Sequence, residues 1–275
     1  MEFIEELKHA WGIKRGDTEN IKPRILENFK DKNYEKVVEL SSKLDYKKEP
    51  LDSELGYALC YSIWHEPGND SEAMGIAQKC AEYYDEARFK EICSRAQEHW
   101  ADTRLKNAAD LRAYPFEQEV EENVVKLYKN ALTWRHENDA LKKRISEKVL
   151  KAYDAIGEKY YDNSLAENDN WKDRKSKKDY ASWAIPHFEK SGNTNRVSTM
   201  QRIVKELEEK IKEDNIKFGK PLKDFPEASG FCNKLIKAGY TTLGDFLKAS
   251  ESEIDKIPKI GPSAMKEIRA FRDKF

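Results

Sequence analysis

Apolar residues along most of this chain recur at intervals of three and four residues, the spacing of one face of an α-helix. Residues 53–64 are typical, with an apolar stripe made of Leu55, Ala58, Leu59 and Ile63. Residues branched at Cβ are sparse, and no run of alternating apolar and polar residues is long enough to indicate a strand. The pattern therefore predicts an all-α protein.

The same spacing predicts a series of helices over the first 215 residues. In chain order they cover residues 2–11, 21–29, 31–40, 53–64, a helix capped by Ser71, and residues 87–100, 120–134, 145–161, 180–188 and 197–215. Pro23 falls in the first turn of its predicted helix, where a missing amide is tolerated. Polar breaks are expected at residues 102–107 and 162–179.

Helix pairs in this region are separated by turns at Asn33, Gly68-Asn69 and Gly192-Asn193. Around the first turn, asparagine precedes Tyr34 and then an apolar stripe, which loosely resembles the start of a tetratricopeptide helix. The spacing of the turns is irregular, so the resemblance implies an irregular helical-repeat body. Such folds leave a concave surface between stacked helix pairs, and the resemblance therefore implies a protein partner on this body.

Residues 225–275 carry the densest signals for helix starts and ends. A short helix over residues 232–237 is predicted to end at Gly239, because glycine tolerates the positive φ found just past a helix. Polar caps or proline open the later helices, and these residues are Thr241 or Thr242, Ser250 or Ser252, and Pro262. The segment is therefore expected to form a small module of short helices.

The stretch Ile257-Pro258-Lys259-Ile260-Gly261-Pro262-Ser263-Ala264 resembles the hairpin of helix-hairpin-helix domains. In such a hairpin, backbone amides at a helix start present partial positive charge, and glycine lets a phosphate approach them. The family has glycine at both ends of the turn. Here Lys259 takes the first place, and its side chain can itself reach a phosphate.

The longer run is similar to the C-terminal domain of the bacterial RNA polymerase alpha subunit. The matching positions are Asn233 with Leu235, residues 243–247, and Ile260-Gly261 followed by Glu267-Ile268. Gly230 stands where the family has a DNA-contacting arginine. Together the two resemblances imply a set of nucleic-acid-binding residues: Asn233, Lys234, Lys259, Gly261, Ser263 and Lys266.

Charge and hydropathy argue against a protein that coats nucleic acid and against one that spans a membrane. The chain has 275 residues and a formal net charge of −1, and its last 51 residues, with nine basic and seven acidic side chains, carry +2. A nearly neutral protein does not coat nucleic acid, since affinity for DNA depends on neutralised phosphates. No apolar run is long enough to span a bilayer, and the acidic, amphipathic start is unlike a signal peptide. We therefore expect a cytoplasmic location and no membrane partner.

Catalytic and metal-binding motifs are missing from the sequence. None of the short nucleotide-binding, zinc-protease or serine-hydrolase motifs occurs, and the five histidines are scattered. The four cysteines, Cys60, Cys80, Cys93 and Cys232, have no metal-ligand spacing and sit among apolar neighbours, so buried thiols are expected. The sequence therefore predicts no enzyme activity, no cofactor and no metal.

Two further sets of residues have a second interpretation. The aromatic series Tyr57, Tyr61, Trp64, Tyr83 and Tyr84 has helical spacing, which favours core packing, with a peptide- or base-stacking groove as the alternative. The lysines of residues 172–178 favour a solvated surface. Their alternative role is a supporting contact to nucleic acid.

These observations predict a helical-repeat body at residues 1–215, a linker at 216–224 and a helix-hairpin-helix domain at 225–275. The expected function is a non-enzymatic adaptor whose body binds a protein and whose C-terminal domain contacts double-stranded DNA or transcription machinery. The alternative is a pure protein-interaction scaffold without nucleic-acid binding. A third class is an enzyme whose site no short motif reveals.

Overall fold

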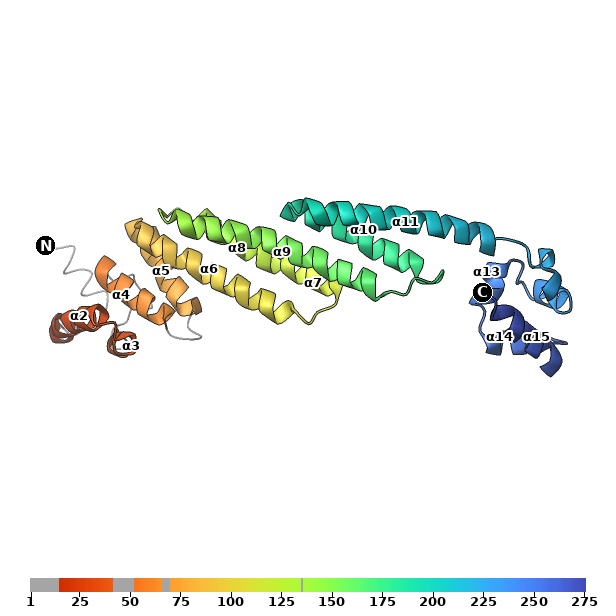
Figure 1. Ribbon diagram of the computed structural model, residues 1–275. Helices are drawn as coiled ribbons and strands as arrows, with labels where there is room; N and C mark the ends of the chain where they lie inside the picture. The colour runs from red at the N-terminus through yellow and green to blue at the C-terminus, as the bar shows by residue number, and fades with distance from the viewer. Residues whose placement is uncertain (1–14, 42–51, 66–69, 135) are drawn as a thin grey trace. The chain divides into compact units, whose positions relative to one another are not determined.

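The computed structural model describes residues 15–41, 52–65, 70–134 and 136–275, and these residues are almost entirely helical (Figure 1). The elements in chain order are α2 (Arg15–Lys30), α3 (Tyr34–Ser41), α4 (Ser53–Trp64), α5 (Asp70–Tyr84), α6 (Ala87–Ala108), α7 (Ala113–Glu119), η1 (Val120–Val124), α8 (Val125–Thr133), α9 (Asp139–Ala166), α10 (Arg174–Ser191), α11 (Thr194–Phe218), η2 (Leu222–Asp224), η3 (Pro226–Ala228), α12 (Cys232–Lys237), α13 (Leu243–Lys248), α14 (Glu251–Asp255) and α15 (Pro262–Arg272). Strand-like pairing in these residues is restricted to one isolated bridge between Pro221 and Thr242. The prediction of an all-α protein is confirmed.

Two predictions fall outside the described residues: the helix over residues 2–11 and the turn at Gly68-Asn69. The turn at Gly192-Asn193 is confirmed, with Gly192 at φ 78°. Helix α4 has the predicted bounds, and the side chain of Asp52 caps it by accepting a hydrogen bond from the Leu55 amide at 3.2 Å. No helix in the described part of the chain combines the length and apolarity that crossing a membrane requires.

Several helices are longer than the sequence predicts. The expected break at residues 102–107 lies inside α6, and most of the expected loop at 162–179 belongs to α9 and α10. Pro23 is inside α2 rather than in its first turn. These predictions were wrong, and for the two polar stretches the reason is that side chains of neighbouring helices bond to them.

The α6 stretch shows how this works. The Asp102 carboxylate accepts hydrogen bonds from the Tyr128 hydroxyl of α8 at 2.6 Å and from Lys148 Nζ of α9 at 2.5 Å. Polar residues that bond to adjacent helices do not compete with the backbone of their own helix. A helix can therefore continue where its apolar stripe is interrupted.

The chain divides by packing into two units. The first unit contains the described residues up to Lys159 together with Pro186–Thr194, and the second contains Tyr160–Ile185 and Asn195–Phe275. This division differs from the predicted boundary after residue 215. The predicted linker at 216–224 also differs, because Phe218 and Leu222 are buried in the core of the C-terminal module.

Among the described residues of the first unit, buried apolar side chains pack between successive helices, and two clusters of them involve α2 to α6. One lies between α2, α3 and α4 and includes Ile25, Val37 and Leu59. The other lies between α4, α5 and α6 and contains three of the cysteines, Cys60, Cys80 and Cys93. All four cysteines are free and buried, as predicted, and burial raises the pKa of Cys80 to about 11 and that of Cys93 to about 12.

The C-terminal module, residues 225–275, surrounds a compact aromatic core. Phe231, Phe246 and Phe271 are fully or almost fully buried, with ring centroids 5.7 to 6.3 Å apart. The predicted helix 232–237 has the bounds of α12, and Gly239 follows it at φ 98°. The caps Thr242 and Ser250 are confirmed, each as part of a capping box in which the third helical residue, Asp245 or Glu253, bonds back to the cap.

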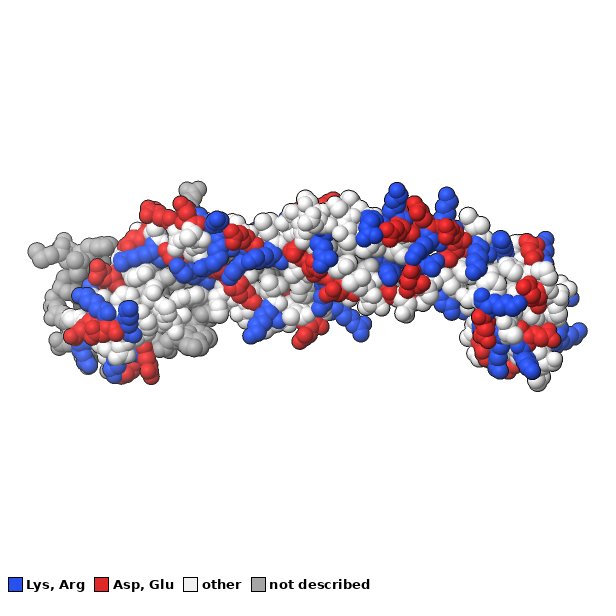
Figure 2. All heavy atoms as spheres, in the orientation of Figure 1, with Lys and Arg blue, Asp and Glu red and all other residues white. Residues whose placement is uncertain are grey.

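Surface charge is mixed over the described residues. Figure 2 shows lysine, arginine, aspartate and glutamate side chains interspersed on the visible face. Many of them form ion pairs within one helix or between neighbouring helices, such as Arg202 with Glu206 and Arg269 with Glu251. Candidate binding surfaces must therefore be found from side chains whose charge is not already compensated.

Candidate nucleic-acid interface

The turn between α14 and α15 has an unusual backbone. Lys259 adopts φ 70°, in the left-handed region that favours glycine. The turn is closed by a hydrogen bond from the Ile260 amide to the Ile257 carbonyl at 3.1 Å, and both of these side chains are buried. Lysine in this conformation costs about 1 kcal/mol or more, so the core contacts of Ile257 and Ile260 hold the turn in a conformation that glycine would adopt freely.

Helix α15 follows directly and begins with exposed amides. Gly261 is its N-cap and has no side chain to accept a hydrogen bond, and Pro262 occupies the first helical position. The amides of Ser263 and Ala264 in the first turn thus have no intrahelical acceptor. With the helix dipole, they create partial positive charge where the Lys259 side chain is also exposed.

The side chains predicted to bind nucleic acid are accessible. Asn233, Lys259, Ser263 and Lys266 are exposed, whereas Lys234 and Gly261 are half-buried. They belong to two places on the module, the start of α12 and the hairpin with the first turns of α15. Gly230, which precedes α12, lies against α15, since a Cβ on Gly230 would be 3.0 Å from Glu267 Oε2. The structure therefore places a carboxylate beside Gly230.

Arg272 is not available to a phosphate. Its Nη2 donates to the carbonyl oxygens of Phe246, at 2.9 Å, and Ala249, and the guanidinium lies 5.2 Å from the Phe246 ring centroid. Arg272 therefore joins the end of α15 to α13. The positive charge available on the module comes from lysines.

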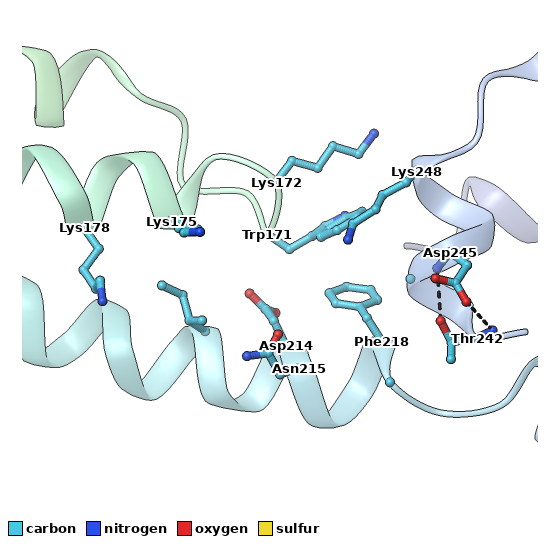
Figure 3. A pocket seen from close by; sticks show the side chains of 13 residues that line it. Trp171, Lys172, Lys175, Lys178, Asp214, Asn215, Phe218, Thr242, Asp245 and Lys248 are labelled. Atoms are coloured by element: carbon cyan, nitrogen blue, oxygen red, sulfur yellow. Dashed lines mark hydrogen bonds between the residues drawn. The ribbon is translucent and has the colours of Figure 1, made fainter. Parts of the chain in front are cut away.

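A second basic region lies in the second unit, next to the module. A cavity of about 900 Å³ is lined by Trp171 and by residues of α10, α11 and α13 (Figure 3). Its cationic side chains are Lys172, Lys175, Lys178 and Lys248. The lysines singled out at residues 172–178 are thus on the surface, but Lys175 and Lys178 project from a helix rather than from the predicted loop.

A third cluster, which the sequence did not reveal, lies in the first unit. His187 Nε2 is 3.0 Å from Glu117 Oε1, and its Nδ1 is 3.7 Å from Glu121 Oε1. The glutamates are four residues apart, where α7 passes into the π-helical turn η1. Only that spacing is visible in the sequence, because His187 comes from α10.

The side chains of this third cluster also have contacts with one another and with Lys190. Its three ligand atoms lie within 4.8 Å of one another, a separation that suits a cation. However, His187 Nε2 already lies 3.0 Å from Glu117, and Lys190 Nζ bonds to Glu121 at 2.7 Å. Burial lowers the pKa of His187 while the two glutamates oppose that shift. A metal ion would have to replace these contacts.

Comparison with known proteins adds no relative: no family model, no curated protein and no solved structure matches this chain.

Proposed function

We propose that this chain is a non-enzymatic adaptor whose C-terminal module contacts double-stranded DNA and whose helical body binds a protein. The observation that carries the proposal is the hairpin. Lys259 holds the backbone conformation of a glycine while its ammonium group stays exposed beside an uncapped 11-residue helix. Backbone amides and a lysine are the groups that helix-hairpin-helix turns direct at a phosphate.

The charge of the module fits a small number of phosphate contacts. Arg269 and Lys274 are paired with carboxylates, and Arg272 bonds to backbone carbonyls. Lys234, Lys259 and Lys266 have no carboxylate within ion-pair distance in the described residues. Two or three neutralised phosphates give weak binding, with a slope of log affinity against log salt of only about −2 to −3. The module is therefore expected to add to the affinity of a larger assembly.

The proposed protein-binding surface of the body is an aromatic cavity. It has a volume of about 320 Å³ and is lined by Tyr57, Tyr61, Trp64, His65, Arg88, Glu91, Ile92 and Arg95. Tyr57, Tyr61 and Trp64 are only half-buried. Half-exposed aromatic and arginine side chains are the residues that dominate protein interfaces, which supports the groove interpretation of this series.

The test is binding of the full-length chain to a fluorescent duplex of about 30 base pairs over a salt titration. Lys259→Glu should weaken binding and reduce the slope of log Kd against log salt by about one. Lys259→Gly should reduce the slope similarly while keeping the turn, since glycine accepts positive φ. Lys205→Glu, an exposed change on α11, is the matched control.

Binding that is insensitive to both Lys259 substitutions would contradict the proposal. The second candidate function, a protein-interaction scaffold, is favoured by Glu267, whose carboxylate lies beside Gly230 and would repel a phosphate there. Glu267→Gln separates the two functions. It should strengthen duplex binding in an adaptor, whereas in a scaffold the chain binds no duplex with or without the change.

A further inference from the structure

The basic cavity of the second unit has an excess of positive charge that its own carboxylates do not offset. Two acidic side chains line it, Asp214 and Asp245. Asp214 Oδ2 forms an ion pair with Arg174 Nη1 at 2.6 Å. Asp245 accepts hydrogen bonds from the Thr242 amide at 3.0 Å and the Thr241 hydroxyl at 3.1 Å. Both carboxylates therefore already have partners.

Most lysines of the cavity, in contrast, have no carboxylate partner in the described part of the chain. Lys178 lies 3.6 Å from Glu208. Lys172, Lys175 and Lys248 have no carboxylate within ion-pair distance among the residues that the structure describes, and all three are exposed. They come from the α9–α10 connection, from α10 and from α13. Three ammonium groups from separate elements thus line one hollow, which is a site for several negative charges.

Trp171 adds an aromatic surface to the same cavity. Its ring packs on Phe218, with centroids 4.6 Å apart, and stays half-buried. Lys172 Nζ lies over the ring, 5.6 Å from its centroid, so a base that stacks on this face takes the place of the cation. Figure 3 shows Trp171 between the Lys172 side chain and Phe218. Phe218 is buried in the core of the module, so it provides a fixed support for the indole.

We propose that this cavity binds single-stranded nucleic acid, with backbone phosphates on Lys172, Lys175 and Lys248 and one base against Trp171. Lysines that follow a backbone, combined with an aromatic ring on which a base stacks, are the usual elements of single-strand binding. The cavity volume is within the range that encloses one small ligand, about 300–1,000 Å³. An unpaired base can enter such a space, whereas a base inside a duplex is stacked and paired.

This site does not depend on the hairpin. It uses different side chains and a different form of nucleic acid, so binding of a single strand can succeed where duplex binding fails, and the reverse. A free nucleotide offers the same chemistry, a phosphate and a base. A strand differs from it by presenting several phosphates to the separated lysines.

The experiment measures fluorescence anisotropy of a labelled oligothymidylate of about twelve nucleotides, a typical single-strand site length, with the full-length chain at low salt. Lys175→Glu combined with Lys248→Glu should weaken binding by about tenfold or more, because two phosphate contacts become repulsive. Lys205→Glu combined with Lys212→Glu makes the same charge change on exposed positions of α11 outside the cavity, and should weaken binding far less.

The aromatic contact is tested by Trp171→Leu, which keeps an apolar side chain on Phe218 but removes the stacking surface. We expect about a tenfold loss for the oligothymidylate. The loss of affinity caused by Trp171→Leu should be much smaller for an abasic strand of the same length, because that strand has phosphates but no bases to stack. Circular dichroism melting of each variant checks that the unit remains folded.

Three results would overturn the proposal. The first is equal weakening by the cavity pair and by the α11 pair, which would mean a diffuse charge effect. The second is a loss of single-strand binding in Lys259→Glu without any loss in the Lys175→Glu, Lys248→Glu variant, which would move the site to the hairpin. The third is displacement of the strand by thymidine monophosphate at concentrations near the strand's own Kd, which would make the ligand a free nucleotide.

Discussion

The first unit and the C-terminal module stabilise their helices by different means. In the first unit, ion pairs to a buried carboxylate join helices that are far apart in sequence, in addition to apolar packing. Glu98 of α6 is 5 % exposed and bonds to Arg144 and Lys148 of α9 at 2.6 to 2.8 Å. The module has an aromatic core, and two of its helices, α13 and α14, start at local capping boxes.

This difference decides what each region can do with its polar side chains. Long helices of the first unit use many charges to align with their neighbours, and those charges are occupied. In the module, packing is achieved by apolar residues and by backbone caps, so Lys234, Lys259 and Lys266 remain free of carboxylate partners within the described residues. A region whose fold does not need its surface charge is the one that can offer the charge to a ligand.

The largest expected effect comes from breaking the aromatic core. Phe246 is fully buried and its ring is 5.7 Å from that of Phe271. Phe246→Ala should cost about 3–5 kcal/mol of unfolding free energy, through lost burial and the cavity left behind. Hydrogen exchange should show the loss in the module, with the helices α4 to α6 unaffected. Phe246→Leu is the control and should cost clearly less, and equal exchange in both regions would contradict the distinction.

The next effect concerns the ion pairs of the first unit. Glu98→Gln removes the charge that faces Arg144 and Lys148, and should lower unfolding free energy by about 2 kcal/mol because a buried group loses charged partners. Glu147→Gln on the exposed face of α9 should change it by less than about 0.5 kcal/mol. Denaturant unfolding measures both. If the two changes had equal effects, the ion pairs would not be what holds α6 to α9.

A smaller effect is expected at the caps of the module. Thr242→Ala removes the acceptor for the Asp245 amide at 3.1 Å and should cost about 1 kcal/mol. Thr242→Ser keeps the hydroxyl and should cost much less. Faster hydrogen exchange confined to α13 would support local capping. A loss shared by every helix of the module would mean that Thr242 acts through the core instead.

The smallest expected effect is a difference between the first unit and the module in how their stability depends on pH. Burial lowers the pKa of His187, and the unfolded chain therefore binds a proton at higher pH than the folded one does. Stability should fall as pH is lowered through about 6.5, the ordinary value for histidine. All five histidines lie at or before residue 187, so residues 195–275 have none that titrate in this range.

Hydrogen exchange between pH 7 and 5, corrected for intrinsic rates, tests this difference. Opening should become easier around α7, η1 and the end of α10, and the module should stay unchanged. The groups that face His187 are Glu117, Glu121 and Lys190, so His187→Gln keeps a polar side chain among them and should flatten the response. An unchanged response in His187→Gln would exclude this histidine as its source.

The module was predictable from its sequence because its signals are local. A glycine after α12, a threonine or serine cap before α13 and α14, and a proline at the start of α15 each act within a few residues. The bounds of α12 and the region in which each later helix starts therefore followed without knowledge of the partners. Local signals also indicated a turn between α14 and α15, whereas the positive φ of Lys259 in that turn was not predicted.

The long helices were less predictable because their polar stretches depend on distant residues. Asp102 interrupts the apolar stripe of α6, and only the tertiary structure supplies Tyr128 and Lys148 to bond with it. The same applies to the candidate sites. The lysine-rich stretch was visible in sequence, but its position beside Lys248 of α13, in one cavity, was not.

By itself, then, the sequence determined the all-helical class, the short helices of the C-terminal module and the burial of the chain's four cysteines. Each of these depends on spacing and on residues a few positions apart. Tertiary structure decided where the long helices end, that Phe218 and Leu222 join the module's core, and which charged groups share a cavity. The physical reason is that a charged side chain is neutralised or left free by whatever packs against it, and those neighbours come from remote parts of the chain.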